Sequence, residues 1–418
     1  MGSYQVKLTD FLDHTDPLFR LADRIDWKKL ESLSSNSFSD GPGRPEIPVR
    51  LIAGLHYLKY LENKSDEEAV DTFVHNPYWQ YFCGCEYFQH EVPLHPTTLV
   101  KWRKKLGIRG VEKLLEETLN LAKRERLIKS SDLKRVNVDT TVQEKAITFP
   151  TDAKLYHRMR RILVKAAVKR KLELRQSYER VGQKYFRMQA RYSHFRQMKR
   201  SKACIRKLRV FLGRVIRDIE RKCLNPDPFL QKLLDLAKRL LAQKKNDTNK
   251  IYSLHAPEVE CIAKGKAHKK YEFGCKVSVT STSKNNWIVG VDAVHGNPYD
   301  GHTLKASIDQ VERLCGQRPE EAYVDRGYKG KPNHPDDVKV EVAGTKKKAT
   351  ITVRKYFRRR SAIEPVIGHL KSDHRMGRNF LLERLGDRIN AILAGCAFNL
   401  KKILNFFAEN RTLNMTSL

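Results

Sequence analysis

The chain has 418 residues and a formal net charge of +33, because 81 Lys and Arg outnumber 48 Asp and Glu. A positive field of this size favours a polyanionic partner, and nucleic acid is the usual one. The length allows two or three domains. We find no apolar run of about 18 residues, no secretory signal and no lipidation signal, so a membrane partner is not expected. Eight scattered cysteines without paired CxxC motifs argue against a structural zinc site and indicate buried thiols of a reducing cytoplasm.

The first 130 residues are predicted to form a helical region. A turn-rich segment, Gly41 to Pro48, precedes a run from Val49 in which leucines recur every three or four residues. A capping box at Ser65 to Glu68 is typical of the start of a second helix. The segment His95 to Gly107 is predicted to form a third helix, which Thr97 can cap.

The third helix is a candidate for DNA contact. Small hydroxyl residues at its start and cations along its body are what the recognition helix of a helix-turn-helix offers the major groove. The alternative is a solvated basic helix in an ordinary helical subdomain, and the charge of the whole chain favours DNA contact. The four cations of this helix are Lys101, Arg103, Lys104 and Lys105.

The hydrophobic period changes after a further helix at Val111 to Leu127. Val136 and Val138 alternate with polar residues, which predicts a short strand that ends in Asp139. From Asp152 to Lys250 the chain is helical and strongly basic, with apolar residues spaced as in a helical hairpin. Aromatic residues interleaved with arginine there can stack on bases, but more often pack helix against helix. We expect the cations to contact phosphates.

The last third of the chain is predicted to alternate between strands and helices. Asp300 to Gly316 has the apolar spacing of a helix, and a helix that carries Glu364 follows the last strand. This order predicts a mixed α/β sheet with an all-helical insertion after its first strand. The later strands are expected at Tyr271 to Ser281, Trp287 to Val294, Glu321 to Asp325 and Asp337 to Ala343.

A basic stretch near the C-terminus, Tyr356 to Asn379, is predicted to form one helix with a single buried stripe. Arg360, Glu364 and Lys371 stack along one face of this helix. A lone carboxylate among cations keeps its ionised form, which makes it a good ligand for a divalent cation. The alternative is a surface helix with ion pairs between its own side chains.

Three acidic residues form a candidate catalytic constellation. Asp139 and Asp325 end strands, and the rim where strands end is where α/β sheets bind ligands. A helix packed beside the first strand can bring Glu364 to the same rim. Three ionised carboxylates within ~4 Å repel by about 4 kcal/mol per pair at an effective dielectric near 20. Two Mg²⁺ ions about 3.5–4 Å apart would neutralise them and activate a water or a 3′-hydroxyl.

Each of these acidic residues also has a simpler interpretation. Asp139 could cap a turn, and Asp325 could pair with Arg326. Glu364 could pair with either neighbouring cation of its own helix. Asp292 also lies near a strand end, and composition alone does not exclude it from the site.

Four features in this order resemble the DDE transposases of bacterial insertion sequences, most of all the IS-five group. They are VDTTVQEKAITFPTDAKL from Val138, GNPYDGHTL from Gly296, VDRGYKG from Val324, and the pattern Arg360, Glu364, Lys371. The resemblance covers nearly the whole chain from near Arg44. It implies a helix-turn-helix-like DNA-binding region at 1–130, a ribonuclease-H-like catalytic domain at 131–150 and 251–405, and a basic helical insertion at 151–250.

The resemblance also implies roles for single residues. Asp139, Asp325 and Glu364 would hold two Mg²⁺ ions, for which Mn²⁺ can substitute, and Arg360 and Lys371 would bind the DNA of the transposon ends. The family pattern Tyr-x2-Arg-x3-Glu-x6-Lys departs here at its first position, where the chain has Phe357 and a tyrosine one residue earlier. A helix-capping role for Asp300 explains the GNPYDGHTL stretch as well as a site role for its histidine does. Further candidate site residues are His302, Tyr328 and Tyr356.

The implied function is a transposase that cuts the ends of its own element and joins them to target DNA. The substrates would be double-stranded terminal inverted repeats and target DNA, held by a homodimer in the cytoplasm at the nucleoid. The chemistry would be hydrolysis followed by transesterification, without a covalent enzyme intermediate. Two alternatives are a structure-specific nuclease that does not join strands, and a DNA-binding repressor or architectural protein with an inactive carboxylate cluster.

Overall fold

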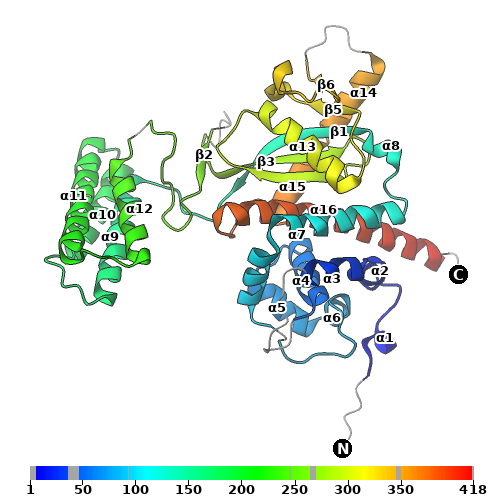
Figure 1. Ribbon diagram of the computed structural model, residues 1–418, viewed down its shortest axis with the longest axis horizontal. Helices are drawn as coiled ribbons and strands as arrows, with labels where there is room; N and C mark the ends of the chain where they lie inside the picture. Colours follow the sequence, from blue (N-terminus) through cyan, green and yellow to red (C-terminus); the bar gives the residue numbers. More distant parts are fainter. Residues whose placement is uncertain are drawn as a thin grey trace, which may run out of the picture. The chain divides into compact units, whose positions relative to one another are not determined.

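Figure 1 shows the computed structural model, which describes residues 6–35, 47–92, 94–244, 246–263, 270–344 and 350–416. The chain divides into two compact units. The first unit combines Met1–Glu144 with Cys275–Leu418, and the second unit is Lys145–Gly274. The predicted linker Gly41 to Pro48 lies outside the described residues except for its last two positions.

The N-terminal part of the first unit is helical, as predicted. Ser65 caps α5 with the expected reciprocal capping box to Glu68. The start of α7 is capped by His95 rather than Thr97, because Pro96 occupies the first helical position. Gly107, with φ +64°, kinks α7 where the sequence predicted the end of a helix. These helices are α1 (Leu8–Phe11), α2 (Pro17–Arg24), α3 (Trp27–Ser35), α4 (Val49–Leu61), α5 (Asp66–His75), α6 (Pro77–Phe82), α7 (Pro96–Arg124) and α8 (Ser130–Leu133).

A mixed sheet of six strands forms the other part of the fold, in the order β2-β3-β1-β5-β6 with β4 beside β3. β1 pairs in parallel with β5, and β5 with β6, whereas β3 pairs antiparallel with β2 and β4. The predicted mixed α/β sheet is therefore confirmed. The strands are β1 (Arg135–Glu144), β2 (Glu260–Ile262), β3 (Glu272–Thr282), β4 (Ile288–Val294), β5 (Glu321–Val324) and β6 (Lys339–Val342).

The first strand is longer than the sequence predicted. β1 continues five residues beyond Asp139, to Glu144, because its apolar side chains continue through the buried Val142. It lies between β3 and β5 in the sheet. Asp139 is thus an interior residue of β1, and the prediction that the strand ends there is wrong.

Helices α13 (Asp300–Cys315), α14 (Ile351–Arg360), α15 (Ile363–Ser372) and α16 (Glu383–Thr416) complete the first unit. The predicted single helix from Tyr356 to Asn379 is wrong, since α14 ends at Arg360 and α15 begins at Ile363. Pro365 has no backbone N–H, so it fits the first turn of a new helix better than the interior of a long one. The predicted apolar stripe on α15 is nevertheless buried at Ile363, Val366 and Leu370.

The central core element of the first unit is α16, which packs against α7, β4 and α4. Its segment Glu383–Asn410 is long and apolar enough to cross a membrane by length and composition, although Asn390, Asn399, Lys401 and Lys402 interrupt the apolar run. Most of the apolar window, 61%, is buried inside the protein. The apolar composition is therefore what packing at the centre of a core requires.

The second unit contains four helices around its own core: α9 (Asp152–Lys169), α10 (Glu179–His194), α11 (Met198–Lys222) and α12 (Pro228–Ala242). Its aromatic side chains serve packing in part. Tyr178 stacks on Phe211 with ring centroids 4.7 Å apart, and Phe186 stacks on His157. These rings therefore hold helix against helix, the more common of the two uses expected from the sequence.

Candidate functional site

Asp139 and Asp325 are brought together by the parallel pairing of β1 and β5. The register pairs Arg135 with Glu321 and Asn137 with Tyr323, and its continuation sets Asp139 opposite Asp325. Asp139 accepts a hydrogen bond from its neighbour's backbone N–H at 2.8 Å, and Asp325 accepts one from Gly327 N at 2.8 Å. Each aspartate therefore has one oxygen fixed by the backbone.

The second oxygen of each aspartate lies near the guanidinium of Arg360. Arg360 Nη2 is 3.0 Å from Asp139 Oδ2 and 3.9 Å from Asp325 Oδ2. Only 13% of the Arg360 side chain is exposed, so its guanidinium contacts the aspartates rather than solvent. Asp325 is the more accessible carboxylate of the two, at 39% exposed against 15% for Asp139.

The third predicted carboxylate, Glu364, lies in the first turn of α15, four residues after Arg360. Its side chain is exposed. Three ligands of one metal ion need side-chain ligand atoms close to one another. In the described residues, the group of acidic, His or Cys side chains whose ligand atoms all lie within 4.8 Å of one another is Cys275, His295 and Asp387, and it does not include Glu364. The structure thus places Asp139 and Asp325 beside the same cation, Arg360, but it does not place Glu364 within metal-ligand distance of them.

A further carboxylate, Asp300, lies beside the two aspartates and was not predicted as a site residue. Thr140 Oγ1 donates to Asp300 Oδ1 at 2.9 Å, and Lys276 Nζ contacts the same oxygen at 2.8 Å. The N-cap residue of α13 is Tyr299 and Asp300 is the first residue of the helix, so the helix-capping interpretation of Asp300 is wrong. Its one sequence signal was its place in the GNPYDGHTL motif.

The carboxylates of Asp300 and Asp325 lie close to the backbone of Gly327. A Cβ atom at this position would lie 2.9 Å from Asp300 Oδ2 and 2.9 Å from Asp325 Oδ1. The neighbouring Tyr328 is fully buried. Burial raises the pKa of Tyr328 well above its usual value, and the negative charges of the three aspartates raise it further. The Tyr328 hydroxyl therefore stays protonated at the edge of the acidic group.

The other two candidate site residues make ring contacts outside the acidic group. His302 is exposed on α13 and contacts Tyr299 with ring centroids 5.6 Å apart. Tyr356 packs on Tyr323, and the guanidinium of Arg135 lies over its ring. Neither contact involves the acidic group.

The predicted basic helix divides into exposed and buried cations. Lys101, Lys104 and Lys105 are exposed on α7, whereas Arg103 is 3% exposed. Arg103 donates to both oxygens of Asp66, at 2.8 and 2.6 Å. Its assignment to DNA binding is therefore corrected, because a buried two-bond ion pair leaves no donor face for a phosphate. Lys371, the remaining predicted DNA contact, is half-buried at the end of α15.

Comparison with known proteins gives two family matches. Residues 6–105 match the family described as Transposase domain (DUF772), and residues 247–400 match the family Transposase DDE domain. A Rhizobium meliloti protein named "Uncharacterized protein ORF8 in nfe locus" is 43% identical over 194 residues, which are 46% of this chain and 93% of that protein. No solved structure matches. The second match includes Asp300, Asp325, Arg360 and Glu364, whereas Asp139 precedes it.

Proposed function

Because this chain belongs to the transposases that carry a DDE domain, we propose that it cuts DNA at the ends of an insertion sequence and joins those ends to target DNA. The observation that carries this proposal is the register of β1 and β5, which sets Asp139 opposite Asp325. The strand order also supports a ribonuclease-H-like catalytic domain. The antiparallel hairpin β3–β4 lies on one side of β1 and the parallel strands β5 and β6 lie on the other, a mixed sheet that is compatible with that fold.

We assign Asp139, Asp325 and Glu364 as ligands of two Mg²⁺ ions, with Mn²⁺ as a substitute. The two aspartates fit this role, because their outer oxygens already face a cation, Arg360, and carboxylates are the ligands that Mg²⁺ prefers. Bound metal would supply an activated oxygen nucleophile and neutralise charge on the leaving oxygen. Glu364 would join the group through a movement of the first turn of α15.

The remaining residues of the site orient and bind. Lys276 and Thr140 hold Asp300 beside the aspartates. Arg360 and Lys371 would bind phosphates of the transposon end, and the exposed lysines of α7 would bind flanking DNA as part of a DNA-binding region at 1–130. We propose a homodimer on DNA, since two ends must be held for joining, and activity at the nucleoid in the cytoplasm.

Asparagine variants of the two aspartates test this function. Asp139→Asn and Asp325→Asn keep the size of the side chain and remove its charge. We expect each to abolish cleavage of DNA that carries the element's ends, and to abolish joining of pre-cut ends, while binding of the same DNA persists. Asp336→Asn, at an exposed aspartate outside the group, is the matched control and should retain all three activities.

The same assays separate the alternatives. A structure-specific nuclease would cleave but give no joined product from pre-cut ends. A repressor or architectural protein would bind the DNA, and the asparagine variants would behave as the unchanged protein in every assay. Either result would overturn the proposed function.

A further inference from the structure

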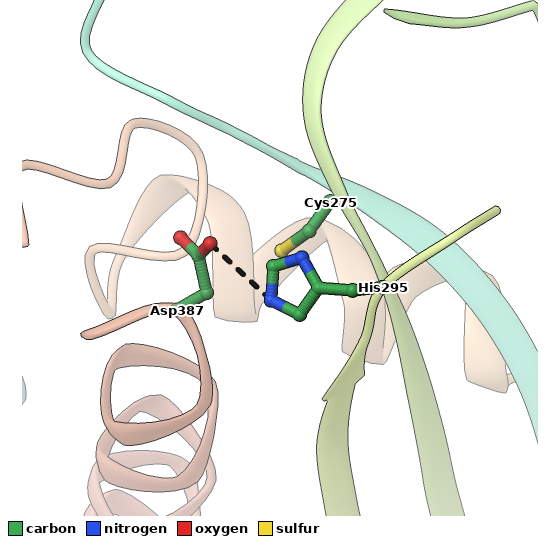
Figure 2. A group of neighbouring side chains, drawn as sticks. All are labelled: Cys275, His295 and Asp387. Carbon is green, nitrogen blue, oxygen red and sulfur yellow. Dashed lines mark ion pairs between the residues drawn. The ribbon is translucent and has the colours of Figure 1, made fainter. Parts of the chain in front are cut away.

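A second group of ligand-type side chains lies within the first unit, apart from the three aspartates. It consists of Cys275 on β3, His295 directly after β4, and Asp387 near the start of α16, as Figure 2 shows. The antiparallel register of β3 and β4 pairs Lys276 with Val294, so its continuation sets Cys275 opposite His295. The sulfur, imidazole and carboxylate ligand atoms all lie within 4.8 Å of one another.

The ligand atoms of the three side chains point toward one another. His295 Nε2 is 3.5 Å from Asp387 Oδ2, and the Cys275 sulfur points toward the same ring. Burial is high, at 1% exposed for Cys275, and at 10% and 5% for the side chains of His295 and Asp387. Three ligand-type groups are thus held close together and away from bulk water, which is the setting of a protein metal site.

Buried amides orient the group from outside. Asn379 Nδ2 donates to Asp387 Oδ1 at 2.6 Å, which turns the other carboxylate oxygen toward His295. Gln143 Nε2 lies 3.7 Å from the Cys275 sulfur, and an N–H directed at sulfur stabilises a thiolate. Gln143 is itself held by Asn390, which donates to its side-chain oxygen at 2.9 Å. Such outer contacts are what orients the ligands of protein metal sites.

We propose that Cys275, His295 and Asp387 bind a transition-metal ion, with Zn²⁺ as the expected metal. Thiolate, imidazole and carboxylate together are a zinc ligand set, whereas Mg²⁺ takes oxygen ligands. Zinc distances of roughly 2.0–2.3 Å require ligand atoms about 3.3–3.7 Å apart, so small side-chain adjustments close the site. Three protein ligands leave the fourth position for water. The cysteine motifs of the sequence do not indicate this group, because its ligands come from the β3–β4 hairpin and from α16, which only the fold brings together.

The metal would connect the β3–β4 hairpin to α16, the central helix of the core. A metal that binds the folded chain and not the unfolded chain stabilises the fold by mass action. This role is independent of the proposed Mg²⁺ site at Asp139 and Asp325. It does not require the chain to be an active transposase.

The test uses the full-length protein and metal ions alone. Purified protein is loaded with Zn²⁺ in excess Mg²⁺, freed of unbound metal and analysed for zinc content. A second sample is loaded with Co²⁺ and its absorption spectrum recorded. We expect one zinc per chain, and a cobalt spectrum with a thiolate-to-metal charge-transfer band and the visible bands of a four-coordinate ion.

Variants assign the bands to the ligands. Cys275→Ser and His295→Gln should lose the charge-transfer band or weaken zinc binding at least tenfold. Cys315→Ser, at a buried cysteine elsewhere in the same unit, and the double variant Asp139→Asn, Asp325→Asn should retain the spectrum and the zinc. Retention by the aspartate variant separates this site from the site proposed for catalysis.

A cobalt spectrum of the unchanged protein without a thiolate band, or equal zinc content in Cys275→Ser and the unchanged protein, would overturn the proposal. If both ligand variants fail to fold, the melting temperature of the unchanged protein decides. It should rise on adding micromolar Zn²⁺ and fall again on chelation, whereas an unaffected melting temperature contradicts the site.

Discussion

The guanidinium of Arg360 lies 3.0 Å from the carboxylate of Asp139 and also 3.9 Å from that of Asp325. One side-chain cation thus lies between the two aspartates that we propose as metal ligands. A positive charge at this distance attracts both carboxylates and opposes the entry of a divalent ion. We infer that Arg360 holds the aspartates in place until DNA phosphate attracts the guanidinium away.

Replacing Arg360 by glutamine should separate these two roles. Without the fixed cation, Mn²⁺ should bind the protein at least several-fold more tightly in the absence of DNA, because one source of repulsion is gone. Cleavage should fall, because a phosphate contact is lost. Calorimetric titration with Mn²⁺ measures the first effect. Arg358→Gln, at an exposed arginine of the same helix, is the control, and equal Mn²⁺ affinity in all three proteins would contradict the inference.

A methyl group at Gly327 should disturb the acidic group directly. In Gly327→Ala, the new Cβ would meet oxygens of Asp300 and Asp325 at 2.9 Å, closer than real Cβ contacts, so a carboxylate must move. We expect at least a tenfold loss of cleavage rate, since misplacement of about 1 Å can cost 10²-fold. Gly368→Ala is the matched control. Gly368 lies in α15 with nothing within 4 Å of the added methyl, so activity should persist and stability should rise by up to about 1 kcal/mol. Equal activities would show that the carboxylates tolerate displacement.

Part of this site could be predicted from the sequence, because the alternation that marks a strand is a local property, whereas the pairing of β1 with β5 is not. Val136 and Val138 identify β1, and the run before Asp325 identifies β5, so the two aspartates could be placed at one rim. Asp300 was not predicted as a site residue, because an acidic residue at the start of a helix has the same sequence signature as a helix cap. Its actual partners, on β1 and β3, come from segments that only the folded sheet brings near.

The basic helix shows the opposite limit. Lys101 and Arg103 are chemically alike in the sequence, yet one faces solvent and the other is buried against Asp66. The partner lies 37 residues away, so helical periodicity alone could not reveal the pair. The break between α14 and α15 is a similar case. The apolar spacing continues through this region and predicts one helix, whereas Pro365 favours the start of a new one.

Arg103→Ala and Lys101→Ala should therefore have different consequences. Removing Arg103 leaves Asp66 with one buried partner fewer, and breaking a buried pair costs about 3–5 kcal/mol of unfolding free energy. Removing the exposed Lys101 should leave stability within about 0.5 kcal/mol. If Lys101 contacts a phosphate, the log–log salt slope of DNA binding should fall by about 0.9. Urea unfolding and binding titrations over a range of salt concentrations measure the two effects, and a stable Arg103→Ala protein would contradict the buried-pair interpretation.

His56 should make the fold sensitive to acid. Its Nδ1–H donates to Ile52 O at 2.7 Å and its Nε2 accepts from Arg103 at 3.3 Å, so the ring is neutral. Burial, and then the positive charge of Arg103, lower the pKa of His56 to about 3, from its usual value of 6.5. Between these two pH values, His56 is protonated in the unfolded chain and neutral in the folded chain. The free energy of unfolding therefore falls as pH falls, by about 1.4 kcal/mol per pH unit. His56→Gln keeps an acceptor for Arg103 but cannot titrate. From pH 7 to pH 5, urea unfolding should show the unchanged protein losing about 2 kcal/mol more than this variant, and parallel losses would exclude His56 as the acid-sensitive group.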